Sequence, residues 1–138
     1  MVVADVARLF GGRAIRSSLD LARAVERGLP VEAADALVAA GALAAGELYR
    51  LVVPRRTLAH RRARGERLTV SESDRLARVA RAVAGADETF GVPETARAWL
   101  RRPNRELDGA VPLELLATEP GARAVEAVLE RLAHGVYA

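Results

Sequence analysis

Arginine side chains dominate the one stretch of this sequence whose residue types could bind a charged partner. The stretch PRRTLAHRRARGERLT, residues 54 to 69, holds six Arg and a single acidic residue. Guanidinium groups present a planar fork of donors that matches phosphates and the edges of guanine bases. The residue types in this stretch therefore indicate contact with a polyanion.

The distribution of charge along the chain supports the same interpretation. The net charge is +3, but residues 1–49 carry five Arg against six acidic residues, residues 50–81 ten against three, and residues 82–138 six against nine. All of the positive excess therefore lies in the middle of the chain. A merely solvated surface normally mixes both signs, so a local excess of this size favours a nucleic-acid partner.

Helical spacing sorts the basic stretch into two faces. At 100° per residue, one polar stripe holds Thr57, His60, Arg61 and Arg64, whereas Leu58 and Ala59 lie opposite. A packed helix, a tight turn at Pro54 and a second helix with a cationic outer stripe are the parts of a helix-turn-helix. We predict DNA binding by these residues of the second helix: Arg55, Arg56, Thr57, His60, Arg61 and Arg64. The alternative from this stretch alone is a solvated helix face without a partner.

No other residue pattern in the sequence indicates a catalytic, metal-binding or cofactor-binding site. The 138 residues include two His, no Cys and no pair of carboxylates at an acid/base or ligand spacing, so we expect no enzyme, no metal site and no cofactor. No apolar run reaches the length of a membrane span, and the first ten residues lack a signal-peptide pattern. We therefore expect a cytoplasmic protein with neither a membrane nor a small-molecule substrate as its partner.

Hydrophobic periodicity is helical throughout and predicts an all-α fold of about eight helices. Ser17 or Ser18 can cap the second helix, and Thr69 with Glu72 forms a capping box, with Ser71 and Asp74 as a second register. Thr118 can cap the last helix. The stretch PNRELDGAVP, residues 103–112, is predicted as a loop because it is rich in Pro, Gly, Asn and Asp.

Several stretches of the sequence resemble the Xre-type antitoxins of the RES-Xre toxin–antitoxin modules, the Xre/MbcA/ParS family. The resemblance covers nearly the whole chain and is most specific in TLAHRRARGERLTVSESDRL, in WLRRPN through GAVPLELL, and in the closing TEPGARAV and HGVYA. It implies an Xre-like helix-turn-helix bundle over residues 1–68 and a small helical toxin-binding domain over residues 69–138. It also implies a homodimer that binds its own operator as a transcription repressor.

The same resemblance implies that the partner is a RES-domain toxin that degrades NAD, and that the antitoxin blocks the active site of this toxin. Toxin contacts are expected from Trp99, Asn104 and Leu107, and from the C-terminal residues Val136, Tyr137 and Ala138. Each assignment has an alternative: Trp99 as a core residue, Asn104 as a turn residue, and a disordered tail. The alternative function is a stand-alone dimeric helix-turn-helix transcriptional regulator.

Overall fold

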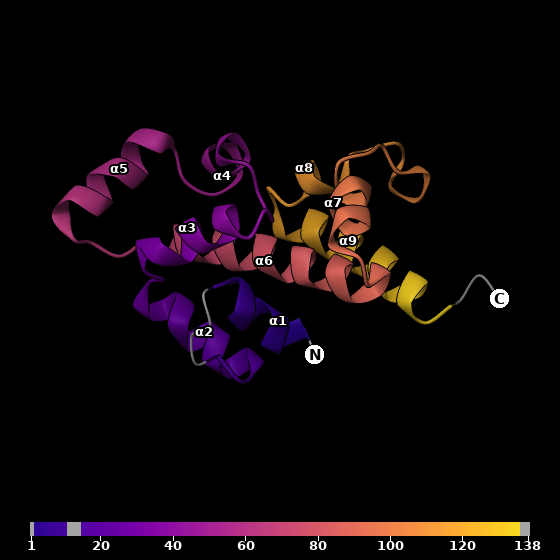
Figure 1. Cartoon of the computed structure of the whole chain (residues 1–138), viewed down its shortest axis with the longest axis horizontal. Helices are drawn as coiled ribbons and strands as arrows, with labels where there is room; N and C mark the ends of the chain where they lie inside the picture. The colour runs from indigo at the N-terminus through magenta and orange to yellow at the C-terminus, as the bar shows by residue number, and fades with distance from the viewer. Residues whose placement is uncertain (1, 11–14, 136–138) are drawn as a thin grey trace.

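The computed structural model describes residues 2–10 and 15–135, and in these residues the predicted all-α fold is confirmed. Nine α-helices are present instead of the expected eight or so, together with one 3-10 turn, η1, in the predicted loop (Figure 1). No strand occurs in the described residues, where a single isolated bridge pairs Asn104 with Ala110. The elements are α1 (Val2–Leu9), α2 (Ser18–Arg27), α3 (Val31–Ala39), α4 (Ala45–Leu51), α5 (Arg55–Arg64), α6 (Val70–Phe90), α7 (Pro93–Leu100), η1 (Arg105–Leu107), α8 (Pro112–Leu115) and α9 (Glu119–Ala133).

The predicted helix starts are confirmed by hydrogen bonds of their cap residues. The Ser17 Oγ accepts from the backbone N–H of Asp20 at 3.1 Å, so Ser17 and not Ser18 caps α2. In the capping box of α6, the Thr69 Oγ1 accepts from the N–H of Glu72, and a carboxylate oxygen of Glu72 accepts from the N–H of Thr69. These bonds satisfy amide groups that have no partner in the first turn of a helix.

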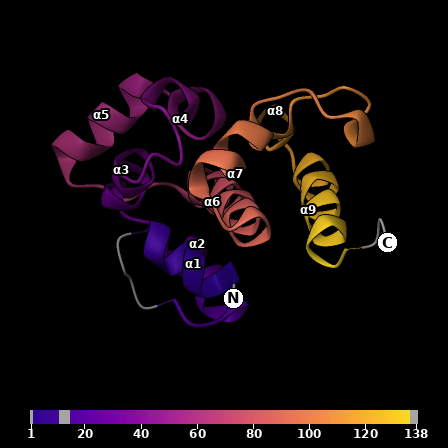
Figure 2. The ribbon, with the colours of Figure 1, turned by 45° about the vertical axis from the view of Figure 1, so that its right-hand side comes forward.

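Helix α6 is the central element of the fold. It packs against α1 and α2 on one side and against α7 and α9 on another, while α3, α4 and α5 lie beyond its N-terminal half (Figures 1 and 2). Leu76, Val79 and Val83 of α6 are fully buried in a core that runs continuously from α1 to α9. The helix is therefore shared by the two parts that the sequence predicts on either side of residue 68.

Gly28 joins the end of α2 to the segment that precedes α6. Its φ of +88° lies in the left-handed region, and a Cβ atom there would come within 2.4 Å of the carbonyl oxygen of Leu68. Next to this contact, the N–H of Leu68 donates to the carbonyl of Leu29 at 2.9 Å. Only glycine combines this dihedral angle with so close an approach of two backbones.

We predict that Gly28→Ala lowers the free energy of unfolding by about 2 kcal/mol or more, because strain and a backbone clash add. Gly46→Ala is the matched control: Gly46 lies inside α4, and no heavy atom would lie within 4 Å of its added Cβ. This control should be neutral or stabilising by up to about 1 kcal/mol. Urea unfolding measures both, and equal stability of the two variants would contradict the prediction.

Candidate functional site

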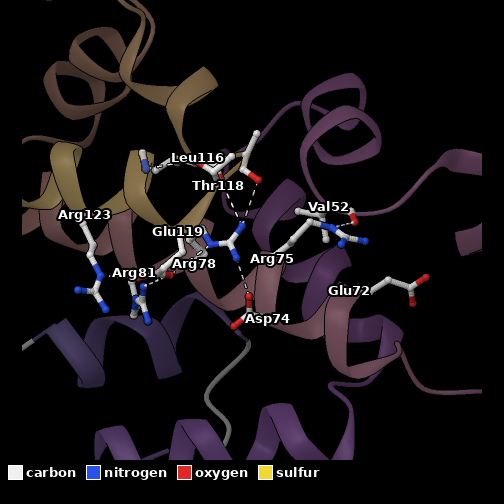
Figure 3. Close-up of polar contacts among 12 residues, drawn as sticks. Val52, Glu72, Asp74, Arg75, Arg78, Arg81, Leu116, Thr118, Glu119 and Arg123 are labelled. Carbon is white, nitrogen blue, oxygen red and sulfur yellow. Dashed lines mark hydrogen bonds and ion pairs between the residues drawn. The ribbon is translucent and has the colours of Figure 1, made fainter. Parts of the chain in front are cut away.

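Helices α4 and α5 form the predicted helix-turn-helix. Three residues, Val52 to Pro54, connect the helices, and both Val52 and Val53 are buried in the turn. The turn is held from α6, where Arg75 Nε donates to the carbonyl of Val52 at 2.9 Å (Figure 3). Leu58 is the buried residue of α5, whereas Ala59, predicted on the same inward side, is exposed. Because Leu58 is the one buried residue of α5, most of the surface of this helix is open to a partner.

The outward surface of α5 is cationic near its N-terminus. Arg55, Arg56 and His60 are exposed, and in the described part of the chain the side chains of Arg55 and Arg56 form neither an ion pair nor a hydrogen bond. Thr57 is half-buried beside them. The N-terminal residues of a recognition helix are those that meet base edges in the major groove. We define Arg55, Arg56 and His60 as the α5 cationic face.

Arg61 is placed differently from the rest of the predicted stripe. Its Nε and Nη2 donate to the two carboxylate oxygens of Glu72 at 2.8 and 3.0 Å, and its side chain is only 19% exposed. Arg61 Nη1 also lies 3.4 Å from Glu66, which in turn pairs with Arg64. The bidentate bond fixes α5 against the N-terminal turn of α6. The Arg61 side chain therefore stabilises the fold, and it would have to leave Glu72 to contact a partner.

Burial alone would raise the pKa of the Glu72 carboxyl, but the hydrogen bonds from Arg61 and from the backbone of Thr69 outweigh it and lower the pKa. The pKa of Glu47 is likewise lowered, against burial, by Arg101 and the N–H of Ala44. A carboxyl whose pKa is lowered by folding stabilises the folded state at pH values above its pKa in the unfolded chain. This stabilisation is lost as the pH falls through the pKa of the folded state.

We therefore predict that the thermal midpoint of unfolding is constant above about pH 5 and falls steadily between about pH 4.5 and pH 2, where these carboxylates become protonated. Glu72→Gln should start from a lower midpoint and show a shallower decline, because it removes one of the titrating pairs. Calorimetry in low-salt buffers across this range measures both effects. A variant whose decline is as steep as that of the wild type would contradict the assignment to Glu72.

The C-terminal half holds the residues expected to meet a toxin. Trp99 is half-buried, packs against the core and lies 5.7 Å from the ring of Phe90, centroid to centroid. The Asn104 side chain accepts from the N–H of Glu106 and caps η1, as its predicted turn role requires. Leu107 packs partly against the core. Val136, Tyr137 and Ala138 lie outside the described residues.

Ion pairs join α4 to the C-terminal half. Arg101, just after α7, donates to both carboxylate oxygens of Glu47 at 2.7 and 2.9 Å, and Arg50 donates to Glu114 of α8 at 2.5 and 3.2 Å. Arg97 of α7 donates to the carbonyl of Gly41 at 3.2 Å. Side-chain ion pairs therefore tie the first helix of the helix-turn-helix to Arg101 after α7 and to α8.

A second junction, which was not predicted, lies at Arg78 of α6. This side chain is 10% exposed, pairs with Asp74 at 2.6 Å and lies 3.5 Å from Glu119 at the start of α9 (Figure 3). Its Nη1 donates to the carbonyls of Leu116 and Ala117 after α8, each at 3.4 Å. Arg78 thereby ties α6 to the segment between α8 and α9. Its burial could not be predicted from the sequence because these two carbonyls lie about forty residues away along the chain.

In the described residues, no group of three or more His, Cys, Asp or Glu side chains could hold a metal ion. None of the helices in that part of the chain is long and apolar enough to cross a membrane.

Comparison with known protein families assigns a domain type to each half. The antitoxin Xre-like helix-turn-helix domain matches residues 20–81, which contain α4 and α5. The antitoxin Xre/MbcA/ParS C-terminal toxin-binding domain matches residues 85–135. The two matches meet within α6, between residues 81 and 85.

Three curated relatives carry the name antitoxin Xre. The protein of Pseudomonas putida is 40% identical over 84 residues, which are 61% of this chain and 53% of the relative. That of Yersinia enterocolitica is 33% identical over 119 residues, 85% of this chain and 80% of the relative. That of Photorhabdus laumondii is 32% identical over 114 residues, 81% and 77% of the two chains. The match thus spans about half of the first relative and about four fifths of the others.

Proposed function

This chain belongs to the antitoxin Xre family, and we propose that it is the antitoxin of a type II toxin–antitoxin module. It binds and neutralises a RES-domain toxin that degrades NAD, by blocking the active site of that toxin. It also represses its own operon, as a homodimer, through α5. The observation that carries the proposal is the succession of the two matched domains, helix-turn-helix and toxin-binding, along one chain.

The α5 cationic face is the part proposed to bind DNA. Arg55 and Arg56 supply free guanidinium donors to this face, and His60 completes it. Arg64, which pairs with Glu66, lies one turn beyond His60, and Thr57 is half-buried. Arg61 was predicted as a further contact, but its bidentate pair with Glu72 favours a positioning role. A phosphate would have to displace a carboxylate to reach it.

The C-terminal half is proposed to bind the toxin. Trp99 and Leu107 are partly exposed, and Leu107 belongs to η1, the turn that Asn104 caps, so their surface can be covered by a partner without unfolding the domain. The tail from Val136 to Ala138 is proposed to enter the active-site cleft of the toxin. Large aromatic side chains at a domain surface commonly anchor protein interfaces.

Copurification with a partner tests the proposal. The chain is tagged and expressed from its native operon together with the product of the neighbouring reading frame. We expect a RES-domain protein to copurify in stoichiometric amount. A stand-alone transcriptional regulator would purify without it, so absence of that protein under conditions in which the tagged chain is folded would reject the antitoxin function.

A further inference from the structure

A second cationic site lies at the C-terminal end of α2, outside the α5 cationic face. A cavity of about 390 Å³ is lined by the guanidinium side chains of Arg23, Arg27 and Arg67, and Asp20 is the one acidic residue among its described lining residues. All three arginines are exposed. We call Arg23, Arg27 and Arg67 the α2 basic pocket.

Two of the three arginines of this pocket, Arg23 and Arg27, lack the carboxylate partners that most other described arginines have. In the described ranges, neither the Arg23 nor the Arg27 side chain makes an ion pair or a hydrogen bond, whereas Arg62, Arg78 and Arg101 each pair with a carboxylate. Asp20 does not compensate, because its carboxylate accepts from the backbone N–H of Arg16 at 3.0 Å and no ion pair with either arginine forms.

Internal electrostatics do not explain the pocket. Arg23 and Arg27 are four residues apart on α2, a spacing at which two like charges destabilise a helix. The dipole of α2 stabilises a cation in its last turn, which accounts for Arg27 but not for Arg23 one turn earlier. Three guanidiniums beside one engaged carboxylate instead form a binding site for an external anion.

Hydrogen bonds join this pocket to the segment that follows α5. Arg67 Nη1 donates to the carbonyl of Gly28 at 3.0 Å, and the N–H of Leu68 donates to the carbonyl of Leu29 at 2.9 Å. The N–H of Leu29 in turn donates to Ser73 Oγ of α6 at 2.8 Å. The residues that follow α2 are therefore bonded both to the connection between α5 and α6 and to α6 itself.

The position of the pocket relative to α5 indicates which anion it meets. Arg67 follows the last residue of α5, Arg64, by three positions, so their Cα atoms lie within about 10 Å. Ten helical residues are about 15 Å long, slightly more than the roughly 12 Å width of the major groove. Groups just beyond an end of α5 therefore lie near a sugar–phosphate strand that borders the groove.

We propose that the α2 basic pocket binds a backbone phosphate of the DNA whose major groove receives α5. The proposal rests on the DNA-binding role proposed above and adds to it a phosphate contact from outside the helix-turn-helix. A contact of this kind sets the register and orientation of the protein on the duplex without reading its sequence. The affinities of the chain for its specific duplex and for a random duplex should therefore depend equally on this contact.

The test compares Arg23→Gln/Arg27→Gln with the matched control Arg102→Gln/Arg105→Gln, which removes two exposed arginines from the C-terminal half. Affinities of the full chain for its own upstream duplex and for a random duplex are measured by fluorescence anisotropy over a salt series. The slope of log affinity against log salt should become shallower by about 1 per bound chain for the pocket variant, on both duplexes, and stay unchanged for the control.

The possible results separate the two proposals. If the wild-type chain binds neither duplex, the DNA-binding role fails and this pocket role fails with it. If the wild type binds and the slope of the pocket variant equals that of the control, only the pocket role is overturned. The same conclusion follows if the variant elutes as a smaller oligomer with an unchanged slope, because the pocket is then a contact between copies. Arg67→Gln gives an independent measurement should the double variant not fold.

Discussion

Replacement of Arg61 by Ala is expected to lower the free energy of unfolding by about 3 kcal/mol, although Arg61 lies on a charged surface helix. The change removes both donors of a bidentate bond and leaves the Glu72 carboxylate, only 9% exposed, without its cation. An uncompensated charge in a buried position costs far more than the loss of a solvent-exposed pair. Urea unfolding at pH 7 measures the difference.

Arg55→Ala provides the matched control for Arg61→Ala, since it removes the same group from an unpaired position on the same helix. Its stability should stay within about 0.5 kcal/mol of the wild type, whereas its DNA affinity should fall and its salt dependence weaken. The double variant Arg61→Ala/Glu72→Ala should be less destabilised than the two single changes added together. Equal stability of Arg61→Ala and Arg55→Ala would show that the pair with Glu72 does not hold α5 in place.

Deletion of Val136 to Ala138 is expected to abolish neutralisation of the toxin while leaving the fold and DNA binding intact. Helix α9 ends at Ala133, and the N–H of the next residue, His134, donates to the carbonyl of Glu130, so the helix ends before the deleted residues. The proposed role of the tail is to occupy the active-site cleft of the toxin. Growth of cells that express the toxin with full-length or truncated antitoxin measures the effect.

The circular dichroism spectrum and the affinity for upstream DNA serve as controls for the truncated chain and should match those of the full chain. Tyr137→Ala is a milder variant that tests whether the aromatic side chain carries the effect. Should the truncated chain protect cells as well as the full chain does, the tail would have no part in the mechanism, and the surface around Trp99 and Leu107 would have to block the toxin.

Local signals in the sequence were sufficient to predict the helices. Thr69 and Glu72 marked the start of α6 because both halves of a capping box lie within four residues. Thr118 marked the start of α9 as a single cap residue, whose hydroxyl oxygen accepts from the N–H of Gly121. Pro54 marked the start of α5, which ends at Gly65 with a φ of +65°. Such signals involve neighbours in the chain, so a single sequence contains them completely.

The electrostatic character of the site could be predicted only in part. The excess of arginines in the middle of the chain was visible, but its division into paired and unpaired side chains was not, because pairing depends on tertiary contacts. Arg61 finds Glu72 eleven residues away, and Arg101 finds Glu47 across 54 residues. Helical spacing placed Arg61 on the outer stripe, whereas the contact of α5 with the start of α6 turns it inward.

Measurement of NAD consumption by the purified partner toxin tests directly whether this chain neutralises the toxin by blocking its active site. The toxin is assayed alone, with an equimolar amount of this chain, and with the chain that lacks Val136 to Ala138. We expect NAD loss with the toxin alone, suppression of this loss by the full chain, and restored loss with the truncated chain. A toxin that consumes NAD at the same rate in the presence of the full, folded chain would contradict this expectation.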